Sequence, residues 1–338
     1  MPYFLMNIQN KHFTPIKGKL NSYSIMKKLL FILIGLILLI VAGLYIFIPG
    51  RITISKSITI EASQKALFRK LQNTESWREW WPAKKGEMDT TNTYSLNGFK
   101  FTPGPAKIIS VPISIDVPEF TTSSELIFIS TSPDVTTLQI ETSIPVPYNP
   151  FKRVAIYFKT KKIENSFSEI LQSINATYSK IANLYGYDIQ KKSVVDSTLV
   201  FTFEETKGYP SVSKIYSLID ELRSYIKQNS AAETGFPMLN TSKSDSVNYI
   251  VKVAIPVNKK LPDSEKIHYR WMLGGGNILI TEVKGGQNEI TNAYKQIQNY
   301  VSDYNRSAPA IPFESLVTDR RKEPDSSKWI TRIYYPVI

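Results

Sequence analysis

The 338-residue sequence contains no cysteine and only two histidines, His12 and His268. Without thiols the chain can form no disulfide, no cysteine nucleophile and no thiolate metal site. The two histidines lie far apart in the sequence, so we expect neither a metal site nor a catalytic triad built on them. No paired carboxylates or nucleophile–base arrangement marks a catalytic centre either. These absences favour a binding or structural protein without a cofactor over an enzyme.

Acidic residues are fewer than basic ones, with 29 Asp and Glu against 41 Lys and Arg and a formal net charge of +12. Such an excess can indicate nucleic acid, anionic lipid or acidic ligands as partners. Here the charge is spread along the chain in short groups such as Lys84-Lys85 and Arg320-Arg321-Lys322, and no helix-turn-helix is evident. We therefore expect no nucleic-acid partner.

One long stretch, Leu29–Ile48, carries no charged residue. At 1.5 Å rise per residue, about twenty apolar residues match the ~30 Å hydrocarbon core of a bilayer. The stretch therefore predicts a transmembrane helix over residues 29–48 that ends at Pro49-Gly50. The preceding residues 1–28 contain five lysines and no acidic residue. This bias predicts a single-pass protein of the cell membrane, with a basic cytoplasmic leader and its soluble part on the extracytoplasmic (periplasmic) side.

Two alternatives concern this N-terminal region. A cleaved signal peptide would have a shorter apolar region, usually 7–15 residues, and small residues at the cleavage site. The end of the run, Leu44–Ile48, lacks such residues, which favours a retained anchor. Met26-Lys27-Lys28 is also typical of a bacterial translation start, which would make residues 1–25 an upstream extension.

Residues 51–188 alternate between strand and helix patterns typical of one soluble domain. Arg51–Ile60 has isoleucines at every second position over most of its length, and predicts a half-buried strand. Ser63 can cap the helix Gln64–Leu71 that follows. The further predicted elements are four strands and one long amphipathic helix: Thr93–Phe101, Lys107–Ile115, Ser124–Ile129, Thr136–Ile144 and Phe151–Tyr185.

This order of elements is α+β. The opening segment S-I-T-I-E-A-S, the W-x-x-W-W-P motif at Trp77–Pro82 and the long last helix resemble the START-like/polyketide-cyclase superfamily (SRPBCC). The resemblance implies a helix-grip fold, in which a sheet curls round a long helix and leaves an apolar tunnel. Members of this superfamily include lipid carriers and cyclases.

Trp77, Trp80 and Trp81 allow two interpretations. They can line a ligand-binding mouth, because aromatic side chains dominate apolar pockets. They can equally pack at the sheet edge or contact the membrane interface, where tryptophan is enriched. Packing is the simpler expectation, and ligand binding is kept as the functional hypothesis.

Residues 193–338 contain an internal repeat with an offset of about 78 residues. Each half has a strand, a helix, a Phe-containing loop and a strand ending in an apolar-Pro-Val motif, Ile255-Pro256-Val257 and Tyr335-Pro336-Val337. Duplication of this kind predicts a pseudo-twofold domain. The first half comprises Leu199–Phe203, Val212–Ile226, Gly235–Pro237 and Val247–Val257, and the second Ile278–Val283, Ile290–Tyr304, Pro312–Glu314 and Trp329–Ile338.

The repeated strand-helix-strand-strand pattern resembles the gyrase-inhibitor-like (GyrI-like) effector-binding domain of bacterial drug-responsive regulators. The resemblance implies a groove between the halves that binds apolar, often cationic compounds beside a buried glutamate. The matching position is Glu314, although Leu316 stands where the family usually has a tyrosine. Because a buried carboxylate favours a cationic partner, we expect aromatic residues around Glu314 to add cation–π attraction. The aromatic residues expected there are Tyr216, Phe236, Tyr294 and Trp329.

Together these patterns predict a bacterial membrane-anchored binding protein for small hydrophobic or cationic ligands or lipids. Its expected parts are the leader 1–28, the transmembrane helix 29–48, a START-like domain over 51–188 and a GyrI-like domain over 193–338. One alternative is a small-molecule hydrolase that uses Glu314 as its acid or base. The other is a structural, partner-binding module whose groove is filled by side chains.

Overall fold

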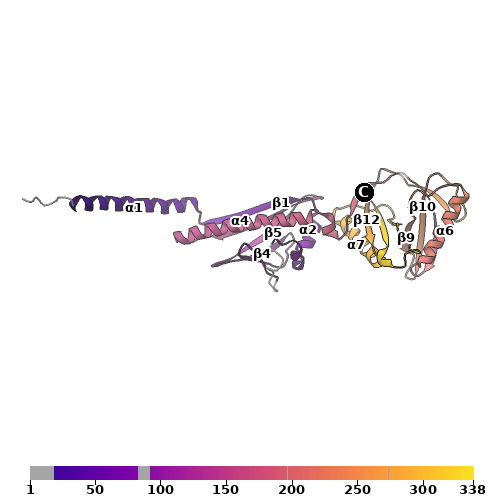
Figure 1. The fold of residues 1–338 in the computed structure, drawn as a ribbon, viewed down its shortest axis with the longest axis horizontal. Helices are drawn as coiled ribbons and strands as arrows, with labels where there is room; N and C mark the ends of the chain where they lie inside the picture. The colour runs from indigo at the N-terminus through magenta and orange to yellow at the C-terminus, as the bar shows by residue number, and fades with distance from the viewer. Residues whose placement is uncertain (1–18, 83–91, 196, 273) are drawn as a thin grey trace, which may run out of the picture. The chain divides into compact units, whose positions relative to one another are not determined.

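The computed structural model describes residues 19–82, 92–195, 197–272 and 274–338. Most of the predicted leader, residues 1–18, and the basic pair Lys84-Lys85 lie outside the described residues. The chain forms two compact units: a small one, up to Ile54 together with Ser143–Glu164, and a large one, Ser55–Thr142 with Asn165–Ile338. Both sheets are antiparallel and helices accompany each, so the protein is α+β as predicted (Figure 1).

The small unit begins with the helix α1 (Lys19–Phe47). Among the described residues, its segment Ser24–Phe47 is the one stretch long and apolar enough to cross a membrane. The helix ends at Phe47, two residues before Pro49, because proline cannot continue an α-helix. The predicted span 29–48 thus lies within α1 apart from its last residue, Ile48.

The first sheet has six strands in the order β1-β6-β5-β4-β3-β2. Its strands are β1 (Arg51–Ile60), β2 (Tyr94–Leu96), β3 (Phe99–Pro103), β4 (Ser110–Val117), β5 (Phe120–Ser132) and β6 (Val135–Pro145). The prediction of one strand over Thr93–Phe101 is wrong. Asn97 and Gly98 both have positive φ, and this pair forms a tight hairpin turn that splits the run into β2 and β3.

The helices of this part of the chain are α2 (Gln64–Leu71), α3 (Trp77–Trp80), α4 (Pro150–Tyr178) and α5 (Ile181–Tyr185). The predicted long helix Phe151–Tyr185 breaks at Lys180, whose backbone is extended, and ends at the left-handed Gly186. The prediction that Ser63 caps α2 is also wrong. Its backbone lies at the N-cap, but its hydroxyl instead donates 2.8 Å to the carbonyl of Asp303.

The second sheet has eight strands in the order β11-β8-β10-β9-β13-β14-β12-β7. It comprises β7 (Gln190–Ser193), β8 (Ser197–Lys207), β9 (Met238–Lys243), β10 (Asn248–Val257), β11 (His268–Met272), β12 (Asn277–Lys284), β13 (Phe313–Leu316) and β14 (Ile330–Val337). The central order β8-β10-β9 is mirrored by β12-β14-β13, so the predicted internal duplication is present in the sheet. The pseudo-twofold axis runs between β9 and β13, which pair with each other.

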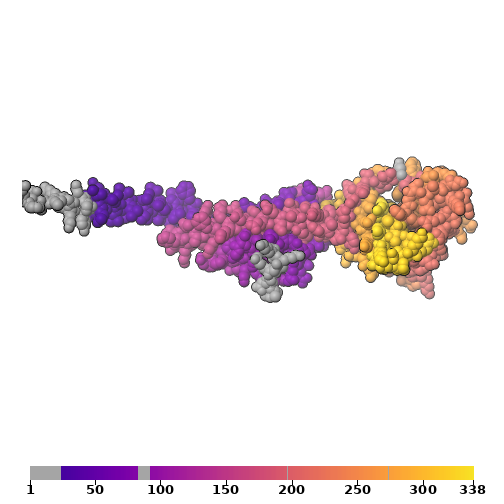
Figure 2. Space-filling model, viewed as in Figure 1, coloured from indigo at the N-terminus to yellow at the C-terminus, as the bar shows by residue number. Residues whose placement is uncertain are grey.

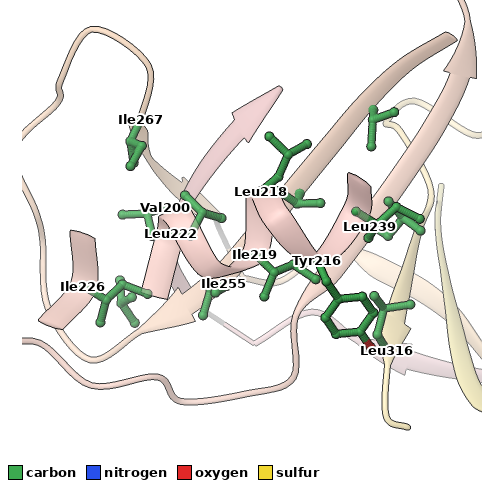
Figure 3. Packing of buried hydrophobic residues seen from close by; sticks show 14 of the residues in the cluster. Val200, Tyr216, Leu218, Ile219, Leu222, Ile226, Leu239, Ile255, Ile267 and Leu316 are labelled. Carbon is green, nitrogen blue, oxygen red and sulfur yellow. The ribbon is translucent and has the colours of Figure 1, made fainter. Parts of the chain in front are cut away.

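Two equivalent helices cover one face of this sheet, α6 (Val212–Gln228) and α7 (Gln287–Asp303). Apolar residues of α6 at three- and four-residue spacing pack on the sheet, and Figure 3 shows Ile219, Leu222 and Ile226 in this cluster. Leu316 of the second repeat joins the same cluster. In Figure 2 the C-terminal residues (yellow) lie against orange residues of the first repeat, in agreement with the β9–β13 pairing.

The large unit contains two modules: the first is built around the six-stranded sheet, and the second comprises the eight-stranded sheet with α6 and α7. They meet where α2 and α5 pack on α7. Asp303, at the end of α7, is buried and accepts hydrogen bonds from the Arg69 guanidinium and from the Tyr185 hydroxyl, the latter at 2.8 Å. Burial and the Asp303 charge raise the pKa of Tyr185 above its ordinary value. The tyrosine therefore stays a neutral donor, and this polar contact connects the first module to the second.

Candidate functional site

Glu314 lies on β13 at the pseudo-twofold axis. Strand alternation places it with Leu316 on the helix-covered face of the sheet, while Phe313 and Ser315 point to the open face. Its direct cross-strand partner is Leu239 of β9, which is also its equivalent in the first repeat. The duplicated position is therefore an apolar core residue in one half and a buried carboxylate in the other.

The negative charge of Glu314 is compensated by Arg320, which is equally buried. The Arg320 Nη2 lies 3.3 Å from Glu314 Oε2 and donates 3.0 Å to the Thr331 hydroxyl. Its guanidinium carbon lies 4.8 Å from the centroid of the Trp329 ring. Burial raises the pKa of Glu314 above its ordinary value, and the Arg320 charge offsets part of that increase. A cation of the protein itself thus occupies the position expected for a cationic ligand.

The Glu314 charge also acts on two tyrosines, Tyr209 and Tyr294. Burial and the Glu314 charge raise the pKa of Tyr209 to about 12, and the same two causes raise the pKa of Tyr294. The Tyr209 hydroxyl donates 2.8 Å to the side-chain carbonyl of Gln287. Both phenols therefore remain protonated near neutral pH, so they can donate hydrogen bonds but cannot supply a base.

The aromatic residues predicted around Glu314 do not all lie beside it. Trp329 stacks on Arg320, and the buried Tyr216 accepts 2.8 Å from the Arg320 backbone N–H and lies under the Arg321 guanidinium. Tyr294 is near enough to Glu314 for the carboxylate charge to raise its pKa. Phe236 stands in the loop before β9 and exposes 47% of its surface, so it is not part of a buried wall.

The three tryptophans Trp77, Trp80 and Trp81 lie in the core of the first module, each less than a tenth exposed. Trp77 contacts Trp80 at 4.9 Å and stacks on Trp81 at 5.9 Å between ring centroids. The Trp77 indole donates 2.7 Å to the carbonyl of Leu71, and the Trp81 indole donates 3.0 Å to that of Ser95. This arrangement agrees with the packing interpretation.

A cavity of about 500 Å³ lies on the open face of the second sheet, opposite the helices. We call it the open-face cavity. Most of its lining side chains alternate along each strand with those of the helix-covered core, as Phe201 does with Val200, and two core residues, Leu239 and Val253, also reach it. The wall is mainly apolar and includes Leu199, Phe201, Met238, Ile278, Phe313 and Pro336.

Neither the open-face cavity nor Arg320 was expected from the sequence. Arg320 belongs to the run Arg320-Arg321-Lys322, which resembles surface charge, and no local pattern marks its first member as buried. The cavity could not be found because it needs residues from both repeats and from the β11 edge. One sequence feature could have indicated it. Leu199, Val200 and Phe201 are consecutive apolar residues, so β8 is apolar on both faces.

No protein-family model matches the chain, and no curated protein matches it. Among solved structures, the C-terminal domain of EcmrR is 19% identical over 45% of this chain and 98% of its own, with a TM-score of 0.39. SAV2435 bound to tetraphenylphosphonium is 16% identical over 44% of this chain and 93% of its own, with a TM-score of 0.29.

The ZhuI aromatase/cyclase from Streptomyces sp. R1128 is 10% identical over 37% of this chain and 92% of its own, with a TM-score of 0.25. All these identities lie below 25% and all these TM-scores below 0.5. The chain is similar to these proteins, and the similarities assign it neither a family nor an activity.

Proposed function

We propose that this chain is a membrane-anchored protein that binds a small hydrophobic molecule or lipid in the open-face cavity. The observation that carries the proposal is the cavity itself. Ligand pockets typically measure about 300–1,000 Å³ and are mainly apolar with a few polar groups. The open-face cavity has this size and character, with Asn240, Lys252 and Arg270 among its polar lining residues.

Anchoring is supported by the contacts of the small unit. The Arg153 guanidinium is buried and donates to the carbonyl of Ile48 from both Nε and Nη2, at 2.9 and 2.6 Å. It also lies over the Tyr45 ring, and the Tyr45 hydroxyl donates to the carbonyl of Tyr148. A cation at a helix C-terminus complements its free carbonyls. These bonds hold the start of α4 against the end of α1.

The surface beside that junction is typical of a membrane interface. Tyr148 and Phe151 expose 89% and 84% of their surface, and Lys152 lies between Phe151 and Arg153. Aromatic residues are enriched at the headgroup level of bilayers, and lysines favour anionic headgroups. A tether at this point would keep the second module near a supply of hydrophobic molecules.

A cationic ligand at Glu314, as the sequence led us to expect, would have to displace Arg320. The buried pair supports a structural role for this carboxylate instead. Binding at the open-face cavity does not depend on Glu314, because the two lie on opposite faces of the sheet.

The binding proposal can be tested with the full chain in lipid nanodiscs. Hydrophobic compounds, lysolipids and tetraphenylphosphonium are added in turn while the melting temperature is followed, because a ligand of the folded state raises it by mass action. The substitution Ala254→Phe should fill the cavity and abolish the increase. Ala232→Phe, in an exposed loop, should leave it unchanged. A wild-type protein that responds to no compound in the panel would exclude the binding role.

A small-molecule hydrolase is the second candidate, and the raised pKa of Glu314 favours it. A carboxyl group with a raised pKa holds its proton to a higher pH than an ordinary one, and a protonated carboxyl can act as a general acid. Turnover of small esters that is lost in Glu314→Gln but retained in Ala254→Phe would support this candidate. Hydrolysis that survives Glu314→Gln would exclude Glu314 as its acid.

A further inference from the structure

The open-face cavity has an excess of positive charge. Among the residues that the structure describes, its charged side chains are Lys252 and Arg270, and no aspartate or glutamate side chain lines it. In the part of the chain that the structure describes, neither cation forms an ion pair, and Arg270 packs over the Phe201 ring at 5.6 Å. Ile338 also lines the cavity. Two cations therefore lie in the wall of a mainly apolar space.

The internal repeat provides a comparison for Lys252. Its equivalent in the second repeat is Arg332, and both residues lie on the strand that ends in Pro-Val. Arg332 Nε lies 2.9 Å from Glu282 Oε2 on the neighbouring strand. At the position of Glu282 the first repeat has Phe203, directly opposite Lys252. Only the repeat whose cation faces the cavity lacks the neutralising carboxylate.

From this charge asymmetry we propose that the ligand of the open-face cavity is a single-chain amphipathic anion, with a hydrocarbon tail and a carboxylate or phosphate head. This inference rests on the proposed binding function. The tail would replace water along Phe201, Ile278 and Phe313, which is favourable in proportion to the apolar area buried. The head would accept charge-assisted hydrogen bonds from Lys252 or Arg270, which are stronger than those between neutral groups.

Four eight-carbon probes that differ in their head group test this proposal: octanoate, octyl phosphate, 1-octanol and octylammonium. Each is titrated into the full chain in zwitterionic nanodiscs, with empty nanodiscs subtracted, and affinity is measured by calorimetry. We expect at least one anion to bind about tenfold more tightly than octanol, and octylammonium to bind most weakly. Comparison of octanoate with octyl phosphate distinguishes a fatty acid from a phospholipid-like head group.

The variant Lys252→Gln/Arg270→Gln should remove the preference for anions while octanol binding remains. Arg332→Gln is the matched control, because it removes the equivalent cation outside the cavity, and it should keep the preference. Equal binding of all four probes would overturn the inferred ligand class and leave the binding function intact. Binding of none would overturn both. Loss of octanol binding in the double variant would indicate a damaged fold. The single variant Lys252→Met, which preserves the apolar stem of the side chain, then tests the proposal by the ratio of anion affinity to octanol affinity.

Discussion

At the residue scale, the ion pair between Glu314 and Arg320 is the most consequential contact of the second module. Both groups are buried, so each stabilises the other's charge in a region with little water. Removal of one partner leaves an uncompensated buried charge, which typically costs about 3–5 kcal/mol. Replacement of both by apolar residues is often close to neutral. The repeat indicates which residue fits at Glu314, because its equivalent is Leu239.

We therefore expect Arg320→Met to lower the free energy of unfolding by about 3–5 kcal/mol. The double variant Glu314→Leu/Arg320→Met should recover most of that loss, because it removes both charges. Urea unfolding followed by tryptophan fluorescence measures both values. A double variant as unstable as the single one would show that Arg320 stabilises the fold by its packing on Trp329 rather than by its charge.

The raised pKa of Glu314 also predicts a dependence on pH. Because the folded state holds this proton more tightly than the unfolded chain, its contribution to stability is complete below the ordinary value of 4.5. The contribution is lost as the pH rises through the raised pKa of the folded state. Above pH 4.5 the melting temperature of the wild type should fall relative to that of Glu314→Gln. The exposed Glu282→Gln serves as control, and a constant difference would contradict the expected shift.

At the element scale, the exposed start of α4 makes a prediction about the bilayer. Phe151 and Phe158 are seven residues apart, so they lie on the same side of the helix about two turns from each other, and both are largely exposed. Because the chain has no cysteine, single nitroxide labels can be placed at Phe151, Phe158 and, as control, the exposed Val195. We expect oxygen to relax the first two labels and a water-soluble nickel chelate to relax the third. Equal access of the chelate to all three would place α4 in water.

Elements with strong periodicity were predicted well from the sequence. The strand Arg51–Ile60 and the helix Gln64–Leu71 have the predicted bounds, because alternating isoleucines and a compact apolar face admit one structure each. The errors arose where one residue decides the backbone: the turn at Asn97-Gly98 and the break at Lys180 lie inside otherwise continuous patterns. The repeat was visible because duplication leaves a signal in one sequence. The pairing of Glu314 with Arg320 left no signal in the sequence, because a separation of six residues does not determine whether a strand residue contacts a loop residue.

At the scale of the whole molecule, the polar contact at Asp303 is expected to make the two modules unfold together. Asp303→Ala would leave Arg69 and the Tyr185 hydroxyl without their acceptor, and an unsatisfied buried group costs about 1–3 kcal/mol. We expect the single thermal transition of the wild type to separate into two. Differential scanning calorimetry of the full chain in nanodiscs measures this.

Asp134→Ala is the matched control, because Asp134 is exposed and its nearest cation, Arg306, lies 3.9 Å away. That variant should keep one transition with little change in midpoint. If Asp303→Ala also shows one transition, the apolar contacts of α2 and α5 with α7 are sufficient to couple the modules.

The pair of Leu239 and Glu314 at the pseudo-twofold axis also carries information about the origin of the second module. In a dimer of two identical half-length chains, the two residues at this position would be the same amino acid and would face each other across the sheet. Two leucines can pack there, whereas two glutamates would place like charges directly opposite each other. One leucine and one glutamate avoid that repulsion, and the two residues can differ here because both halves belong to one chain.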